Sequence, residues 1–211
     1  MRKEEKPIFI FDIGGVVIIW RNNDPIFKYI AKRYGIPFTK MRDFMNSNLG
    51  YLESGEINCN EFVKSSLEHF GKKLGKNDEP GQLITLPFEH KAKTRKGVVE
   101  IISSLRNQGY KVYGFSNTNY EHALLMKQKG WSVGLFDRFF SSCAIKAIKP
   151  DVKAYRRVLK ALQINGKNVV FIDNTGENIQ GAKRAGIRNT IQFHSTSKLK
   201  QEIAKILSSE D

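Results

Sequence analysis

The chain has 211 residues, of which 40% are hydrophobic and 11% aromatic, so it can form a sizeable globular core. Its 35 Lys and Arg residues exceed its 21 Asp and Glu residues, which gives a net charge of +14. The basic residues are dispersed, so we expect small anionic substrates rather than nucleic acid as partners, and no apolar run is long enough to predict a membrane span.

The N-terminal segment and the cysteines indicate a cytoplasmic protein. Residues 1–7 are mostly charged and the apolar run after them is short, which is not typical of a signal peptide. Cys59 and Cys143 lie far apart in the sequence and have neither disulfide-framework nor metal-ligand spacing. We therefore expect both to be free thiols in a reducing compartment.

The first predicted element is a buried strand that ends at a carboxylate. Residues 8–11 form a short, bounded apolar run, and Asp12 follows it directly. Ligands of open α/β sheets bind just outside the carboxyl ends of the strands, where an aspartate can act as a nucleophile. Gly14 and Gly15 then allow the backbone to fold closely around whatever Asp12 contacts. The alternative is an aspartate that only caps the next turn.

Residues 18–87 are predicted to form a small all-helical insert, which we call the cap. Asp24 and Pro25 are typical of a helix start, and Gly35 is typical of a helix end. Further apolar residues share one face of a later helical run, namely Phe62, Val63, Leu67 and Phe70. Because the insert separates the first strand from the rest of the sheet, we expect it to act as a lid over the site.

The rest of the chain alternates strands and helices. We expect helices over residues 96–108, 120–128, 151–162, 179–185 and from 195 to near 207, and strands over 110–115, 136–142, 169–173 and 190–193. This alternation is typical of an α/β fold with a doubly wound parallel sheet. The predicted core comprises residues 1–17 and 88–211.

Three polar clusters follow the first strand in the sequence. Ser116-Asn-Thr-Asn119 comes directly after a strand, where a hydroxyl and free amides can hold an anion. Lys149 can neutralise a charged intermediate. Asp173 and Asn174, with Glu177, offer the oxygen ligands that Mg²⁺ prefers. Taken alone, each cluster is also compatible with ordinary helix capping or with one surface lysine among many.

The order of these segments carries a family resemblance that covers nearly the whole chain. Asp12-x-Gly-Gly-Val, Ser116-Asn-Thr-Asn, Lys149-Pro-Asp and Asp173-Asn resemble the four motifs of the haloacid dehalogenase (HAD) superfamily of hydrolases. The match is to a branch with a helical cap after the first motif, similar to glucose-1-phosphatase-like enzymes and epoxide hydrolase N-terminal domains. The resemblance implies a Rossmann-like core. Most members transfer phosphoryl groups with Mg²⁺, and a minority cleave carbon–halogen bonds without metal.

The resemblance also implies a role for each motif residue. Asp12 resembles the nucleophile, and Lys149 resembles the lysine that balances charge on the nucleophile and the phosphoryl group. Ser116 and Asn117 resemble the phosphate-binding second motif. The implied metal ligands are Asp12, the backbone carbonyl of Gly14, and the acidic pair of the fourth motif, on which Asp173 and Asn174 fall.

Two positions depart from the family's pattern. The usual general acid/base is an aspartate two residues after the nucleophile, where this chain has Gly14, as do some active glucose-1-phosphatase-like phosphatases. We expect slower protonation of the leaving group unless another side chain substitutes, such as His90, Tyr51 or a residue of the cap. Asn174 stands where most members place a metal-binding aspartate, so we expect weaker Mg²⁺ binding.

The leading functional hypothesis is a Mg²⁺-dependent phosphatase of a small phosphorylated metabolite, for which a sugar phosphate is one candidate. It would act through an aspartyl-phosphate on Asp12. A metal-independent 2-haloacid dehalogenase is the first alternative, because the departures at Gly14 and Asn174 are compatible with a site that needs no metal. A catalytically impaired binding protein is the second. The sequence identifies neither the substrate nor the oligomeric state.

Overall fold

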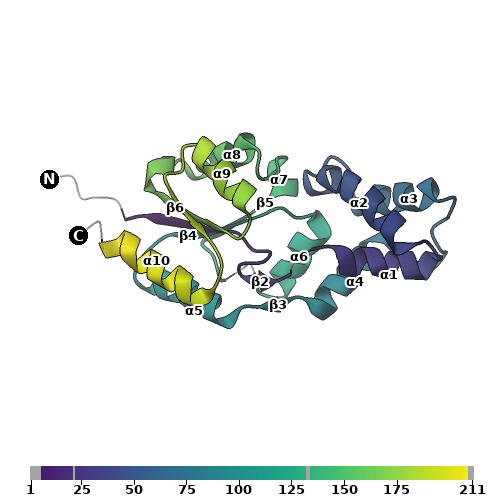
Figure 1. Ribbon diagram of the computed structural model, residues 1–211, viewed down its shortest axis with the longest axis horizontal. Helices are drawn as coiled ribbons and strands as arrows, with labels where there is room; N and C mark the ends of the chain where they lie inside the picture. The colour runs from purple at the N-terminus through teal and green to yellow at the C-terminus, as the bar shows by residue number, and fades with distance from the viewer. Residues whose placement is uncertain (1–5, 21, 132–133, 209–211) are drawn as a thin grey trace.

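The computed structural model describes residues 6–20, 22–131 and 134–208, which form an α/β core joined to a helical cap (Figure 1). Residues 1–5 and 209–211, which the sequence assigns to the core, lie outside the described residues. Within the described ranges, no helix is long and apolar enough to cross a membrane. The cytoplasmic location stays a prediction.

A five-stranded parallel sheet forms the centre of the core. Its strands lie in the order β5-β4-β1-β6-β7, and every neighbouring pair is parallel. Their bounds are β1 (Ile8–Phe11), β4 (Val112–Ser116), β5 (Arg138–Ser141), β6 (Val169–Asp173) and β7 (Asn189–Gln192). The predicted doubly wound sheet is confirmed. Because β1 lies between β4 and β6, the polar residues that follow these three strands meet at one edge.

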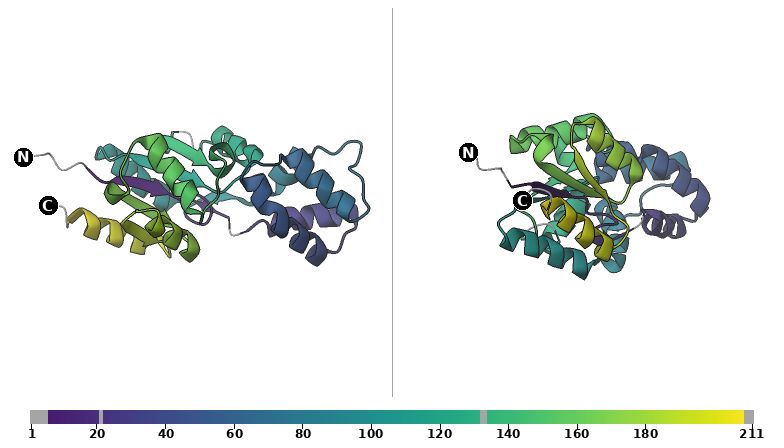
Figure 2. Two further views of the ribbon diagram at one scale, coloured as in Figure 1. Left: turned by 90° about the horizontal axis from the view of Figure 1, so that it is seen from above. Right: turned by 60° about the vertical axis from the view of Figure 1, so that its left-hand side comes forward.

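Helices cover both faces of this sheet, as Figure 2 shows. One face packs against α5 (Lys96–Asn107) and α10 (Thr196–Ser208). The other packs against α8 (Val152–Leu162) and α9 (Gly176–Arg184). Two further core helices, α6 (Tyr120–Gln128) and the short α7 (Ser142–Ile145), follow β4 and β5 at the edge that faces the cap.

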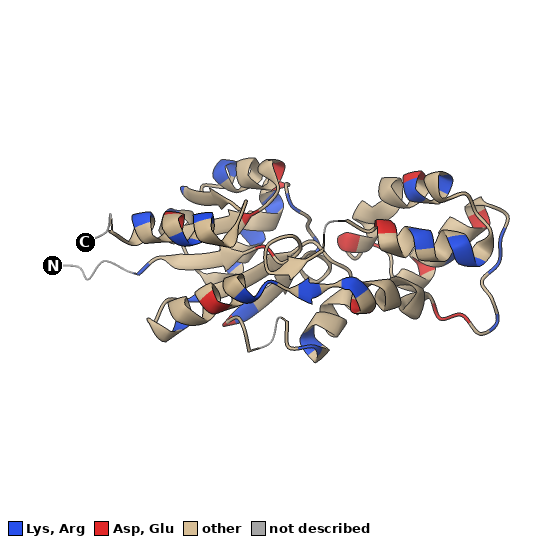
Figure 3. Ribbon diagram, turned by 60° about the horizontal axis from the view of Figure 1, so that its bottom comes forward, with Lys and Arg blue, Asp and Glu red and all other residues tan. Residues whose placement is uncertain are grey.

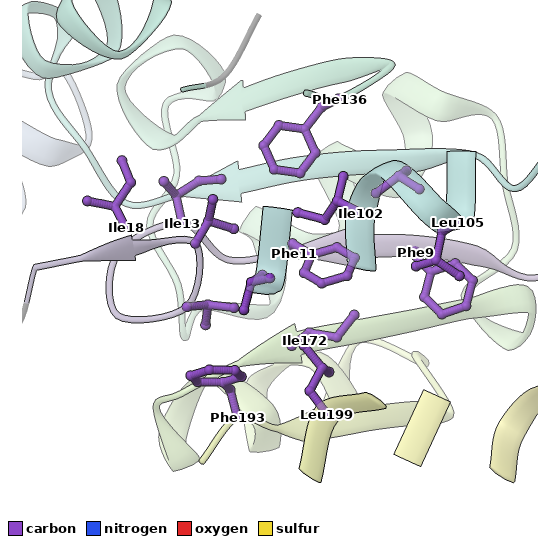
Figure 4. Packing of buried hydrophobic residues seen from close by; sticks show 14 of the residues in the cluster. Phe9, Phe11, Ile13, Ile18, Ile102, Leu105, Phe136, Ile172, Phe193 and Leu199 are labelled. Carbon is purple, nitrogen blue, oxygen red and sulfur yellow. The ribbon is translucent and has the colours of Figure 1, made fainter. Parts of the chain in front are cut away.

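The central strand β1 contributes to both hydrophobic layers. Phe9 and Phe11 belong to the cluster under α5 and α10, whereas Ile10 belongs to the cluster under α8 and α9. This alternation is the two-residue period of a strand that is buried on both faces, and all three side chains are at most 1% exposed. Figure 4 shows the first cluster, in which Phe11 lies near Ile102 and Ile172. The strand that leads to Asp12 is therefore held rigidly from both sides.

The cap is a bundle of helices with a hydrophobic core of its own. Its helices are α1 (Asp24–Tyr34), α2 (Phe38–Glu53), α3 (Cys59–His69) and α4 (Pro80–Lys91). The predicted start and end of α1 are confirmed, since Pro25 lies in its first turn and Gly35 ends it with a φ of 63°. Asn58 and Glu61 form a capping box at the start of α3.

A short ribbon connects the cap to the core. Strand β2 (Ile18–Ile19) pairs antiparallel with β3 (Lys93–Thr94), so both connections run side by side. Arg95 donates hydrogen bonds to the carbonyls of Val16 at 3.1 Å and Gly15 at 3.3 Å, which fixes the turn after Asp12. Helix α4 runs through the predicted boundary between residues 87 and 88, and the domain limits stay a prediction.

Helix α7 was not expected from the sequence, and helix α9 begins earlier than predicted. The helix begins at Gly176 rather than at residue 179, so Glu177 lies in its first turn. The cause is the Asp173 carboxylate, which accepts a hydrogen bond from the Thr175 N–H at 2.8 Å and turns the chain directly into the helix. Polar residues read as a loop are therefore part of a helix.

The positive charge is spread over both parts of the molecule. Figure 3 shows Lys and Arg on the helices of the core and of the cap, with Asp and Glu among them. The dispersion read from the sequence therefore persists in three dimensions. A small anionic substrate remains the partner that we expect from this charge.

Candidate active site

The predicted motif residues meet at a cavity between the core and the cap. Its volume is about 530 Å³. Asp12 follows β1, Ser116 ends β4, and Asn174 follows β6, so the carboxyl ends of three parallel strands supply its floor. Lys149 and Asn117 also line it. With Gly14, six of the seven predicted site residues therefore line one cavity, as the topology of the sheet requires.

A buried ion cluster lies beneath the floor. The Lys149 ammonium donates to Asp12 Oδ1 at 2.6 Å, to Asp173 Oδ2 at 2.8 Å and to the carbonyl of Phe115 at 3.1 Å. These bonds use all three donors of the ammonium, which also lies over the rings of Phe115 and Phe171. Lys149 is only 3% exposed, so its position is fixed by the packing around it.

Burial shifts the pKa values of this cluster. Burial raises the pKa of Asp12, Lys149 lowers it and nearby Asp173 raises it, and together they bring the pKa of Asp12 to about 7. The pKa of Lys149 is raised by the two carboxylates, which outweigh its own burial. The lysine therefore stays protonated across the physiological range, and one ammonium serves two buried carboxylates.

The second motif positions the lysine as well as lining the cavity. The Asn117 side-chain amide donates to the Lys149 carbonyl at 2.8 Å and accepts from the Lys149 N–H at 2.9 Å. The Asn117 side chain therefore fixes the backbone of the loop that carries Lys149. Ser116 lines the cavity and is 5% exposed, and its hydroxyl donates to the carbonyl of Asn117 at 3.3 Å, so its contact with an anion stays a prediction.

The implied metal ligands that line the cavity include a single carboxylate, and Glu177 lines the same cavity. Asp12, Gly14 and Asn174 line the cavity, and they offer a carboxylate, a carbonyl and an amide oxygen. Asp173 does not line it: this fully buried carboxylate accepts from Lys149, from Asn178 at 3.0 Å and from Thr175. Among the described residues, no three His, Cys, Asp or Glu side chains are grouped to hold a metal, so backbone and amide oxygens would have to complete the set.

The two glycines after Asp12 differ in what surrounds them. Gly15 has a φ of 86°, and a Cβ added there would lie 2.7 Å from Asn174 Oδ1, so glycine is required for this close approach. A Cβ added at Gly14 would meet nothing within 4 Å. Nothing steric therefore requires a glycine at the position where the general acid/base aspartate is missing.

Glu53 is a cavity residue that the sequence reading did not identify. It is the last residue of α2 and lines the cavity from the cap side. Its carbonyl accepts a 2.6 Å hydrogen bond from Ser142 Oγ, which in turn accepts the Thr118 N–H at 2.9 Å. Burial raises the pKa of Glu53 to about 7, against the lowering effect of Lys149. The only sequence signal was its place two residues before Gly55.

Tyr51 and His90, which the sequence suggested as proton carriers, do not fit that role, and neither does the cavity residue His122. Tyr51 is 53% exposed, and neither it nor His90, also exposed, is among the residues that line the cavity. His122 lines the cavity, but its Nε2 donates to the carbonyl of Ile84 and its Nδ1 pairs with the Asn119 amide. Burial lowers the pKa of His122 to about 4, so its ring is neutral.

Comparisons with known proteins agree with this geometry. The model of a family described as haloacid dehalogenase-like hydrolase matches residues 7–186. A sesquiterpene phosphatase of Aspergillus oryzae is 24% identical over 194 residues, which cover 90% of each chain. A phosphorylated carbohydrates phosphatase of Thermotoga maritima is 26% identical over 186 residues, 84% of this chain and 81% of that protein. A drimenol cyclase of Aspergillus calidoustus is 30% identical over 116 residues, and this chain spans only 21% of its length.

Solved structures share the fold. A HAD family enzyme of Bacteroides thetaiotaomicron, a mutant in complex with magnesium and inorganic phosphate, superposes with a TM-score of 0.73 at 22% identity, over 90% of this chain and 95% of that one. The L-2-haloacid dehalogenase of Xanthobacter autotrophicus superposes with a TM-score of 0.61 at 16% identity, over 95% of this chain and 83% of that one. At these identities the likeness establishes the fold alone.

Proposed function

This chain belongs to the haloacid dehalogenase-like hydrolase family, and we propose that within it the protein is a Mg²⁺-dependent phosphatase of a small phosphorylated metabolite. The observation that carries the proposal is the contact between Asp12 and Lys149 at the floor of the cavity. A carboxylate at a strand end that accepts a hydrogen bond from a buried ammonium is placed to attack an anionic phosphorus centre.

The reaction has two displacements at phosphorus. An Asp12 oxygen bonds to phosphorus while the bond between phosphorus and the ester oxygen breaks, and that oxygen leaves with a proton as an alcohol. Water then attacks phosphorus, and the bond to Asp12 breaks to release inorganic phosphate. Lys149 offsets the charge of Asp12, and Ser116 offers a hydroxyl to the phosphoryl oxygens.

Three residues would hold the cation: Asp12 through its carboxylate, Gly14 through its carbonyl and Asn174 through its amide oxygen. Mg²⁺ bound there would supply electrostatic stabilisation of the charge on the phosphoryl oxygens. Asp173 acts from below by holding Lys149. With one carboxylate among the ligands we expect a weaker affinity than a site with two would have.

The organic part of the substrate would lie against the cap. Trp20, Leu49 and Phe88 are among the apolar side chains that line the cavity. Such a wall favours a hydrocarbon group over a sugar, because each hydroxyl placed against it loses hydrogen bonds to water. Of the two phosphatase relatives, one is a sesquiterpene phosphatase and the other a phosphorylated carbohydrates phosphatase. A substrate panel should therefore contain both prenyl phosphates and sugar phosphates.

The test is hydrolysis of p-nitrophenyl phosphate, a prenyl phosphate and a sugar phosphate across a Mg²⁺ titration, with Asp12→Asn as the control. We expect activity that rises with Mg²⁺ and falls by more than about 10³-fold in Asp12→Asn. Hydrolysis that persists in the variant would contradict the proposal. Absence of phosphatase activity at every Mg²⁺ concentration, with chloride release from 2-chloropropionate in EDTA, would identify a dehalogenase instead.

A further inference from the structure

The cap supplies a carboxyl group to the cavity in which the family's usual acid/base carboxylate is missing. We propose that Glu53, at the end of a cap helix, is the general acid and base of this enzyme and takes over the role left vacant at Gly14. The inference rests on the proposed phosphatase function. It adds a catalytic residue on the cap that none of the four motifs contains.

Glu53 is held in place by the core. Ser142 Oγ donates to its carbonyl at 2.6 Å and accepts the Thr118 N–H at 2.9 Å, so one hydroxyl links the end of α2 to the loop after β4. Lys146 donates to the carbonyl of Gly55 just beyond. These bonds fix the backbone of Glu53 relative to the residues that would hold the phosphate.

The close approach behind these bonds also requires a glycine. Gly55 has a φ of 69°, and a Cβ added to it would lie 2.7 Å from the carbonyl oxygen of Cys143. Any other residue would push the end of α2 away from α7. The local sequence is therefore built to bring the end of α2, and Glu53 with it, against the core.

The carboxyl group of Glu53 is free to exchange a proton. Within the part of the chain that the structure describes, no protein donor lies within hydrogen-bond distance of it, although it lines the cavity. The charged groups that share the cavity are Lys149, Asp12 and Glu177, while His122 is neutral. Lys149 already serves two carboxylates, so burial prevails and raises the pKa of Glu53 to about 7. Such a group can donate and accept a proton in one cycle.

The proposed steps balance in atoms and charge. As the Asp12 oxygen bonds to phosphorus, the Glu53 carboxylic acid transfers its proton to the ester oxygen, whose bond to phosphorus breaks, and a neutral alcohol leaves. The Glu53 carboxylate then takes a proton from water while the water oxygen bonds to phosphorus. The bond between phosphorus and Asp12 breaks, inorganic phosphate leaves, and Glu53 is again protonated.

The test compares Glu53→Gln with wild type on two esters that differ in their need for an acid. An alkyl phosphate needs a proton on its leaving oxygen, and we expect kcat/KM to fall by about 10²–10⁴-fold. p-Nitrophenolate leaves without a proton, so kcat/KM for p-nitrophenyl phosphate should fall by less than about tenfold. Its turnover should then show a burst of p-nitrophenolate equal to the enzyme concentration, because the aspartyl-phosphate hydrolyses slowly without a base.

Glu56→Gln is the matched control, since Glu56 is exposed on the same loop and does not line the cavity. This variant should leave the hydrolysis rates of both esters unaffected.

A second variant restores a carboxylate at the vacant position. Gly14→Asp has open space for its Cβ, and adding it to Glu53→Gln should raise kcat/KM for the alkyl phosphate by at least about tenfold. In wild type, kcat/KM for the alkyl ester should fall above about pH 7 as Glu53 ionises, and this fall should vanish in Glu53→Gln.

Equal losses on both esters, with no burst and no recovery by Gly14→Asp, would overturn the proposal and leave Glu53 a structural residue. This result is distinct from failure of the phosphatase function itself. In that case wild type would not hydrolyse p-nitrophenyl phosphate, or Asp12→Asn would retain the activity. If Glu53→Gln does not fold, Glu53→Asp replaces it: a shifted pH profile with the burst supports the role, and a profile like that of wild type contradicts it.

Discussion

The two walls of the cavity are built in different ways. The core wall consists of strand ends over a buried cluster in which Lys149, Asp12 and Asp173 satisfy one another. The cap wall consists of helix surfaces, mostly apolar, with Glu53 as a carboxyl that no described donor engages. A carboxylate that is held by a buried cation and hydrogen bonds is fixed in position, whereas a carboxyl without a protein partner is free to bond to a ligand. We therefore expect phosphoryl transfer to depend on the core wall, and leaving-group protonation and specificity to depend on the cap wall.

The largest effect on the core wall is expected from replacing Lys149. Lys149→Met leaves Asp12 and Asp173 buried without a cation, so we expect a loss of about 3–5 kcal/mol in the free energy of unfolding. We also expect kcat to fall by at least about 10²–10³-fold, because the charge on Asp12 and the phosphoryl group is no longer offset. Chemical denaturation and steady-state kinetics measure the two effects. Lys153→Met, on the exposed face of α8, should change neither, and a Lys149→Met enzyme of normal kcat would refute the role of the core wall.

The metal-binding part of the core wall can be sharpened by adding a charge. Asn174→Asp keeps the shape of the side chain and gives the donor set a second carboxylate, so Mg²⁺ should bind about tenfold more tightly. Calorimetric titration with Mg²⁺ alone measures this without reference to activity. Asn46→Asp, exposed on α2, is the control for a general charge effect. Unchanged affinity in Asn174→Asp would mean that this residue does not contact the ion.

The core wall could largely be predicted from the sequence. A bounded apolar run followed by a polar residue identifies a strand and its carboxyl end, as for β6, whose bounds match the prediction at both ends. Parallel topology then brings Asp12, Ser116 and Asn174 together without any knowledge of packing. The hydrogen bonds between the Asn117 side-chain amide and the backbone of Lys149 could not be predicted, because they depend on how two loops pack against each other.

The cap wall could not be predicted in the same way. Helical periodicity indicated the apolar face of the run that forms α3, but it does not predict how the bundle packs on the core. Glu53 reaches the cavity only because Ser142 and Gly55 allow the end of α2 to approach α7. Contacts of this kind join residues about 90 positions apart and follow from tertiary packing, for which spacing along the chain carries no signal.

The apolar character of the cap wall predicts its selectivity. Leu49 is half-buried and lines the cavity from α2. Leu49→Gln should lower the ratio of kcat/KM for geranyl phosphate to that for glucose 6-phosphate by about tenfold, since part of one leucine contact is lost. Leu124→Gln, a 55% exposed position on α6, is the matched control and should leave the ratio unchanged. A ratio that stays constant in Leu49→Gln would show that the organic group binds elsewhere.

The smallest effect that we expect is on stability, through the pKa of Glu53 on the cap wall. Because the folded pKa of Glu53, about 7, lies above its ordinary value of 4.5, the folded state holds this proton more tightly than the unfolded state does. Stability contributed by the protonated group is therefore present at acid pH and is lost as the pH rises through 7.

Glu53→Gln removes the ionised form, and we expect it to raise the free energy of unfolding at pH 8 by about 1 kcal/mol, after allowance for partial exposure. The melting temperature should rise by roughly 2–4 °C at pH 8, and the two proteins should be nearly equal at pH 5. Calorimetry at both pH values, with Glu56→Gln as control, measures the difference. A melting temperature of Glu53→Gln below that of wild type at pH 8 would mean that a partner stabilises the Glu53 carboxylate, as Lys149 stabilises the carboxylates of the core wall. The proposed difference between the two walls would then be wrong.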